Sequence, residues 1–96
     1  MKPSILLEKH RDQIHQIALR HRVSAIKVFG SVARGDDREG SDLDLLVEPT
    51  SDTSMFDIGG IQFEVSQLLG VEVDVLTSRA LPESFKATVL AEALPL

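Results

Sequence analysis

Two short motifs, separated by a polar loop, decide how this chain folds. They read Phe29-Gly30-Ser31-Val32-Ala33-Arg34-Gly35 and Ser41-Asp42-Leu43-Asp44-Leu45-Leu46-Val47. The first motif is typical of a strand that ends at a glycine and turns into a helix. Glycine allows a ligand to approach the backbone closely, and free N–H groups in the first turn of a helix suit phosphate. The Ser31 hydroxyl can donate one more hydrogen bond. A capped turn without a ligand has the same pattern, so this motif alone does not decide the function.

The second motif predicts a strand that carries an acid pair. Over residues 42–47, Leu43 and Leu45 alternate with Asp42 and Asp44, so the two carboxylates lie on one face. Neighbouring carboxylates repel and raise each other's pKa, a cost that a divalent cation relieves. Mg²⁺ takes a few carboxylates and leaves its other positions to water and phosphates. The alternative is two solvated acids on an edge strand, although Asp is depleted in strands.

A third acid follows in a valine-rich stretch, residues 71–76, which predicts another strand. Asp74 and Glu72 share one face of this strand. If it lies beside residues 42–47, Asp74 completes a carboxylate cluster that can hold two metal ions about 3.5–4 Å apart for phosphoryl transfer. Glu72 is the competing candidate. A P-loop is excluded, because Asp36 and Asp37 follow Gly35 where that motif needs Lys and Ser or Thr.

Composition restricts the partners and the compartment. The chain has 96 residues, enough for a single domain over residues 1–96, and 43% of them are hydrophobic. The net charge is −5 and the ten Lys and Arg are scattered, so nucleic acid is disfavoured as the main partner. The absence of cysteine fits a reducing cytosol. No apolar run is long enough to span a membrane, and charge interrupts the N-terminus too early for a signal peptide. We therefore expect a cytoplasmic protein without a membrane partner.

Helices and strands are predicted to alternate along the chain. The expected helices cover residues 4–21, 31–34, 55–69 and from 82 onward, and the expected strands cover 25–29, 42–47 and 71–76. We expect Ser4 to cap the first helix, whose apolar stripe is Leu7, Ile14, Ile17 and Ala18. Gly70 is expected to end the helix over 55–69, and Phe85 and Val89 to pack inward. The order predicts an α/β fold with a small mixed central β-sheet flanked by helices.

Taken together with Asp74, the two motifs resemble those of the nucleotidyltransferase superfamily that includes DNA polymerase β. The short length resembles its smallest branch, the minimal nucleotidyltransferases (MNT). These are usually encoded beside a helical HEPN protein as toxin–antitoxin pairs. The resemblance extends over nearly the whole chain, in element order as well as motif, and implies the polymerase β-like nucleotidyltransferase fold.

The resemblance also implies roles for individual residues. Gly30 and Ser31 would hold the triphosphate of ATP, and Asp42 and Asp44 would bind Mg²⁺. Asp74 would be a further ligand that helps to deprotonate the attacking hydroxyl, with two Mg²⁺ ions in the site. Two other residues match the pattern for nucleotide binding but have ordinary alternatives. Arg34 could instead pair with Asp36 or Asp37, and Ser41 could be a turn residue.

Three functions fit this resemblance. The first is a Mg²⁺-dependent protein adenylyltransferase, an antitoxin that transfers AMP from ATP to a HEPN toxin and so neutralises it. The second is an antitoxin that inhibits the toxin by binding alone. The third is a nucleotidyltransferase that modifies a small molecule such as an antibiotic. The intact Gly-Ser pair and aspartates favour an enzyme. Residues 81–96 are apolar for a terminus and are expected to dock on the domain or on a partner.

Overall fold

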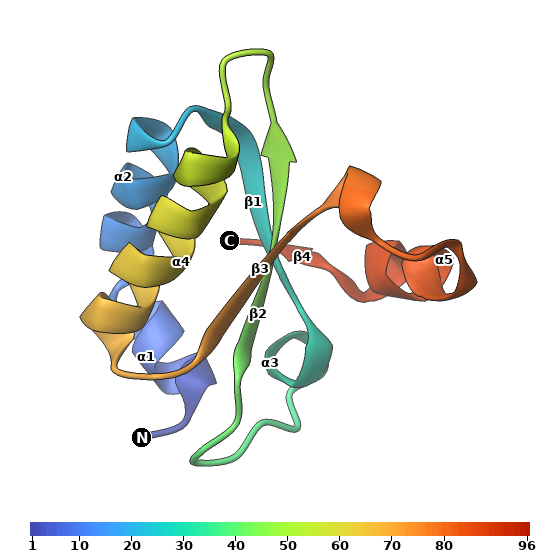
Figure 1. Cartoon of the computed structure of the whole chain (residues 1–96). Coiled ribbons are helices and arrows are strands. Elements are labelled where there is room, and N and C mark those ends of the chain that lie inside the picture. Colours follow the sequence, from blue (N-terminus) through green and yellow to red (C-terminus); the bar gives the residue numbers. More distant parts are fainter.

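A four-stranded sheet organises the chain, as the computed structural model of residues 1–96 shows (Figure 1). The elements follow in the order α1 (Pro3–Lys9), α2 (Arg11–Arg20), β1 (Val23–Phe29), α3 (Gly30–Arg34), β2 (Leu43–Pro49), α4 (Met55–Leu69), β3 (Val73–Thr77), the 3₁₀ turn η1 (Ser78–Ala80), α5 (Glu83–Glu92) and β4 (Leu94–Pro95). The predicted α/β fold is confirmed.

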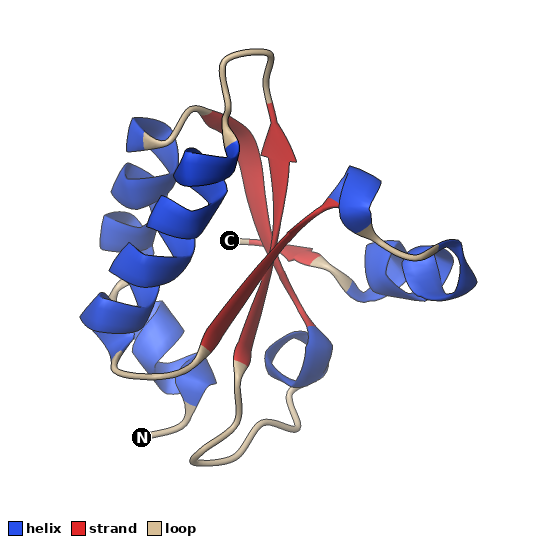
Figure 2. Ribbon diagram, viewed as in Figure 1, coloured by secondary structure: helices blue, strands red, loops and turns tan.

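The sheet is mixed, and its two faces are covered unequally. The strand order is β3-β2-β1-β4. Strand β2 pairs parallel with β3 and antiparallel with β1, while β4 pairs antiparallel with β1. Helices α1, α2 and α4 cover one face, whereas only α3 and α5 lie on the other side (Figure 2). The second face is therefore covered only in part, and we call it the open face because Asp74 is exposed on it.

The main core lies between the sheet and helices α1, α2 and α4. The predicted inward stripe of the first two helices is buried there, as are Leu43, Leu45 and Val47 of β2. Because side chains alternate along a strand, Asp44 and Leu46 point to the opposite, open face. A smaller cluster on that side joins the sheet to the α5 segment and consists of Phe29, Leu46, Leu81 and Val89.

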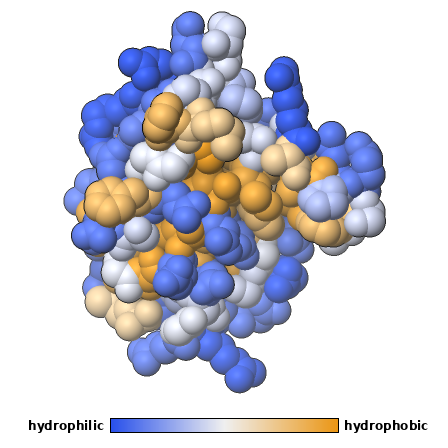
Figure 3. Space-filling view, in the orientation of Figure 1, coloured by the Kyte–Doolittle hydropathy of each residue, from blue (hydrophilic) through white to orange (hydrophobic).

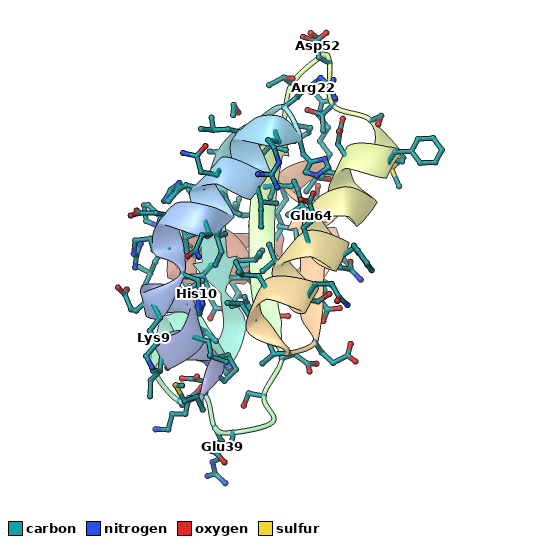
Figure 4. The ribbon with its side chains drawn as sticks, turned by 90° about the vertical axis from the view of Figure 1, so that its left-hand side faces the viewer. Lys9, His10, Arg22, Glu39, Asp52 and Glu64 are labelled. Carbon is teal, nitrogen blue, oxygen red and sulfur yellow. The ribbon has the colours of Figure 1, made fainter.

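The single helix predicted over residues 4–21 is wrong, because the chain breaks at His10 into α1 and α2 (Figure 4). The His10 ring Nδ1 lies 3.0 Å from the Leu6 carbonyl oxygen, and its backbone leaves the helical region with φ −121°. A side chain that bonds to the preceding turn competes with helix propagation. Ser4 is not the cap either, since Lys2 holds that position and Pro3 opens the helix. The Ser4 N–H instead donates to buried Asp37 (2.9 Å).

Helix α4 has the predicted bounds, 55–69. Ser54 and Asp57 form a reciprocal capping box at its start, and Gly70 ends it in the left-handed conformation with φ +69°. Gly60 lies inside the helix because a Cβ there would overlap the His21 imidazole. His21 contacts both Asp57 and Glu64, and thus joins the end of α2 to α4.

The later elements differ from prediction at their edges. The second strand begins at Leu43 rather than Asp42 and the third at Val73 rather than Val71. Val89 packs inward as predicted, but Phe85 is 45% exposed. The chain end docks on the domain, where β4 adds to the edge of the sheet beside β1. None of the helices combines the length and the apolar character that a bilayer crossing requires.

Candidate active site

Two aspartates from neighbouring strands lie side by side on the open face. The parallel register of β2 and β3 places Asp44 directly opposite Asp74. Asp42 lies one residue before β2 and shares the Asp44 face by strand alternation. Of the two candidates for the third acid, the register selects Asp74. Glu72 precedes β3, and its backbone carbonyl accepts a hydrogen bond from the Leu43 N–H (2.9 Å).

Crowding of these acids is visible in the electrostatics of Asp44. Partial burial, together with the negative charges of Asp74 and Asp42, raises the pKa of Asp44 from 3.8 to about 6. The Arg34 guanidinium acts in the opposite direction. Like charges held this close are costly unless a cation or a proton lies among them. The raised pKa of Asp44 is therefore a cost of crowding that a cation bound beside this carboxylate would relieve.

Gly30 brings the first motif against the acid pair. Its φ of +74° is in the left-handed region, and a Cβ at this position would overlap the Asp44 carboxylate. Only glycine satisfies both conditions without strain. Ser31 follows directly, and its hydroxyl makes no hydrogen bond within the chain, so it is free to bind a ligand. The structure therefore joins the two sequence motifs into one site.

Arg34 and Ser41, whose roles the sequence leaves open, differ in the contacts that they make. Arg34 contacts Asp36 (Nε to Oδ2, 3.4 Å) but not Asp37, and it also reaches Glu92 (Nη1 to Oε2, 3.3 Å). Ser41 is a turn residue. Its hydroxyl accepts a hydrogen bond from the Arg38 N–H (2.9 Å), and its own N–H donates to the Arg38 carbonyl (3.0 Å). A direct nucleotide contact by Ser41 therefore has no support from the geometry.

Glu92, at the end of α5, is the residue that sequence reasoning missed. Its Oε1 accepts a hydrogen bond from the Gly30 N–H at 3.0 Å. The two residues are 62 positions apart, and no local pattern around Glu92 marks it as part of a site. Its hydrogen bond to Arg34 is the main reason why the pKa of Arg34 is raised.

The donor set fits a divalent cation that is held jointly with a substrate. No three acidic, histidine or cysteine side chains converge tightly enough to form a complete metal cage. Mg²⁺ does not require one, because it commonly binds through one or two carboxylates and completes its shell with water and substrate phosphates. Asp44 and Asp74 supply such a pair, and Gly30 keeps the space beside them free of side chain.

The acids lie on an open surface rather than in a cavity. The largest pocket, about 570 Å³, lies instead between the N-terminus and the segments that precede β2 and β3, and Asp42, Asp44 and Asp74 do not line it. An open site suits an acceptor that is itself large. Figure 3 shows exposed apolar atoms on the face viewed in Figure 1, extending toward α5.

Comparison with known proteins places this geometry in a class. The profile of the nucleotidyltransferase domain family matches residues 7–96. The chain therefore belongs to this family and is a nucleotidyltransferase enzyme.

Its relatives place it further, among the minimal members. A Methanocaldococcus jannaschii protein named provisionally as a protein adenylyltransferase, MJ0435, is 39% identical over 85% of this chain and 88% of its own length. The protein adenylyltransferase MntA of Thermococcus cleftensis is 32% identical over 93% of this chain and 87% of its own length. A solved structure described provisionally as a minimal nucleotidyltransferase superposes with a TM-score of 0.86 at 39% identity, covering 97% of this chain and 95% of that chain. A toxin–antitoxin complex solved with AMP-PNP shares the fold, with a TM-score of 0.74 at 17% identity. The match covers 88% of this chain and 69% of that chain.

Proposed function

We propose that this nucleotidyltransferase transfers AMP from ATP to a HEPN-family toxin and thereby neutralises it. The observation that carries the proposal is the register of Asp44 with Asp74 beside Gly30, which joins an acid pair to a glycine turn. The names of the relatives favour a protein acceptor, and the complex with AMP-PNP favours a toxin partner and an adenine nucleotide. The open face leaves room for a macromolecular acceptor.

Each part of the site has one task in this proposal. The Gly30 N–H, the Ser31 hydroxyl and Arg34 bind the triphosphate through hydrogen bonds to its oxygens. Asp42, Asp44 and Asp74 hold two Mg²⁺ ions. When bound, these ions neutralise charge on the transferring phosphoryl group and on the leaving group.

The transfer itself is an in-line displacement. The acceptor hydroxyl oxygen forms a bond to the α-phosphorus, and the bond between that phosphorus and the pyrophosphate breaks. The hydroxyl proton passes to the Asp74 carboxylate, and pyrophosphate leaves. The chain contributes mainly by positioning and charge, as is usual for phosphoryl transfer.

The test is incorporation of labelled AMP into the partner toxin co-purified with this chain. Asp42→Asn/Asp44→Asn should reduce labelling by about 10³-fold or more, because it removes the metal ligands. The matched control is Asp52→Asn, an equivalent change at the opposite end of the molecule from Glu39 and the α3–β2 loop (Figure 4). This control should label at the wild-type rate.

Labelling at the wild-type rate by a double variant that melts normally would refute the assigned site. A double variant that fails to label the toxin yet still neutralises it would instead show that binding alone is the function.

A further inference from the structure

The carboxylate of Glu92 lies on the donors that the proposed function assigns to phosphate. It accepts a hydrogen bond from the Gly30 N–H at 3.0 Å. Arg34 Nη1 reaches both of its oxygens, at 3.4 Å and 3.3 Å. Glu92 is the one acid in the chain that contacts both donors, since Asp36 reaches Arg34 alone.

A carboxylate and a phosphate compete for such donors because they use them in the same way. Both are anions whose oxygens accept charge-assisted hydrogen bonds from backbone N–H groups and guanidinium. One N–H group cannot serve both at full strength. A triphosphate that approaches Gly30 also meets the negative charge of Glu92, in addition to that of Asp44.

The Glu92 side chain can move away from Gly30 and Arg34. Its side chain is 21% exposed, so water can replace its present partners. Val89 is the only buried residue within α5, while Phe85 and Leu90 remain exposed on the same helix. Helix α5 is therefore held to the open face by the small cluster around Phe29 and Leu46, while the chain just after it is fixed by the pairing of β4 with β1.

We propose that Glu92 is an inhibitory residue, whose carboxylate stands in for a phosphate group at Gly30 and Arg34 and must be displaced before the triphosphate binds there. The inference rests on the proposed function and adds a regulatory contact to it. The chain alone is then restrained in binding nucleotide, and movement of the Glu92 side chain relieves the restraint.

The test compares the affinities of three variants for Mg²⁺–ATP and for Mg²⁺–tripolyphosphate by calorimetry. Glu92→Gln keeps the shape and removes the charge, while Glu92→Ala removes both. Glu83→Gln, in the first turn of the same helix, makes the same charge change at an exposed side chain that has no hydrogen-bond partner. Thermal melts confirm that each variant is folded.

Both Glu92 variants should bind the two probes about 3- to 10-fold more tightly than wild type. That is the factor expected when the competing contact holds most of the unliganded molecules. Glu83→Gln should bind as wild type does.

Unchanged or weaker binding by both folded Glu92 variants overturns the inference, because Glu92 would then hold the Gly30 turn ready for nucleotide. The nucleotide site itself survives that outcome. Failure of every protein, wild type included, to bind either probe overturns the inference and the proposed site together.

Discussion

Metal-free stability should depend on pH through Asp44. Its pKa is raised in the folded chain from 3.8 to about 6, so the folded state holds this proton more tightly than the unfolded state does. The associated stability is fully present below about pH 4 and is lost as the pH rises through about 6. A shift of about two units corresponds to at most about 3 kcal/mol. Asp42 and Asp74 are exposed and water reaches the site, so we expect about 1–2 kcal/mol after solvent screening.

The perturbation is Asp44→Asn, measured by urea unfolding between pH 4 and pH 8 in the presence of a chelator. At pH 7.5 the variant should be more stable than wild type by about 1–2 kcal/mol, and near pH 4 the two should differ little. Asp52→Asn, at an exposed loop position, is the control and should leave the pH dependence unchanged. A variant that is equally stable or less stable than wild type at pH 7.5 would refute the argument that the acids are crowded.

Three further predictions concern other parts of the molecule. Gly30→Ala should lower the free energy of unfolding by more than about 1 kcal/mol and abolish nucleotide transfer. The substitution combines the backbone strain of a non-glycine residue at φ +74° with a clash against Asp44. Gly35→Ala, at φ +80° with open space around it, should cost only the backbone strain; comparable thermal melts of the two variants would contradict the clash. Contacts with Glu64 and Asp57 raise the pKa of His21, so the stability that they contribute is present below about pH 6.5 and should be lost as the pH rises through the pKa of the folded state. In urea unfolding, the stability of His21→Gln should decline less with rising pH than that of wild type. An identical pH profile would refute this role of His21. The chain should bind single-stranded or duplex oligonucleotides only weakly at physiological salt, because its net charge is −5; submicromolar, salt-sensitive binding in fluorescence anisotropy would contradict this expectation.

The features that the sequence predicted correctly are those with a local physical cause. The alternation of Leu43 and Leu45 with Asp42 and Asp44 defines which face of β2 is buried. Gly70 terminates α4 because the left-handed conformation favours glycine. The valine alternation around Asp74 placed this acid on the correct face, and its pairing with Asp44 followed once the strands were neighbours.

The features that were missed depend on contacts between distant residues. The break at His10 is caused by a ring that bonds to a carbonyl of its own helix, and the apolar stripe continues across it. Asp37 gives no sequence signal that it would be buried against the Ser4 N–H. Glu92 reaches Gly30 only because α5 packs on the open face. Backbone hydrogen bonds to distant carboxylates have no periodicity from which to predict them.

The parallel pairing of β2 with β3 limits how this protein can vary through evolution. Asp44 and Asp74 face one another only because α4 and its short flanking loops return the chain in a fixed register. A slip of β3 by one residue against β2 would move Asp74 from the open face into the apolar layer beneath α4. Length changes that would force such a slip are therefore disfavoured, whereas the exposed loop around Asp52 can vary in length. Homologues that keep the chemistry should differ in loop length at 50–54 and hardly at all at 70–72.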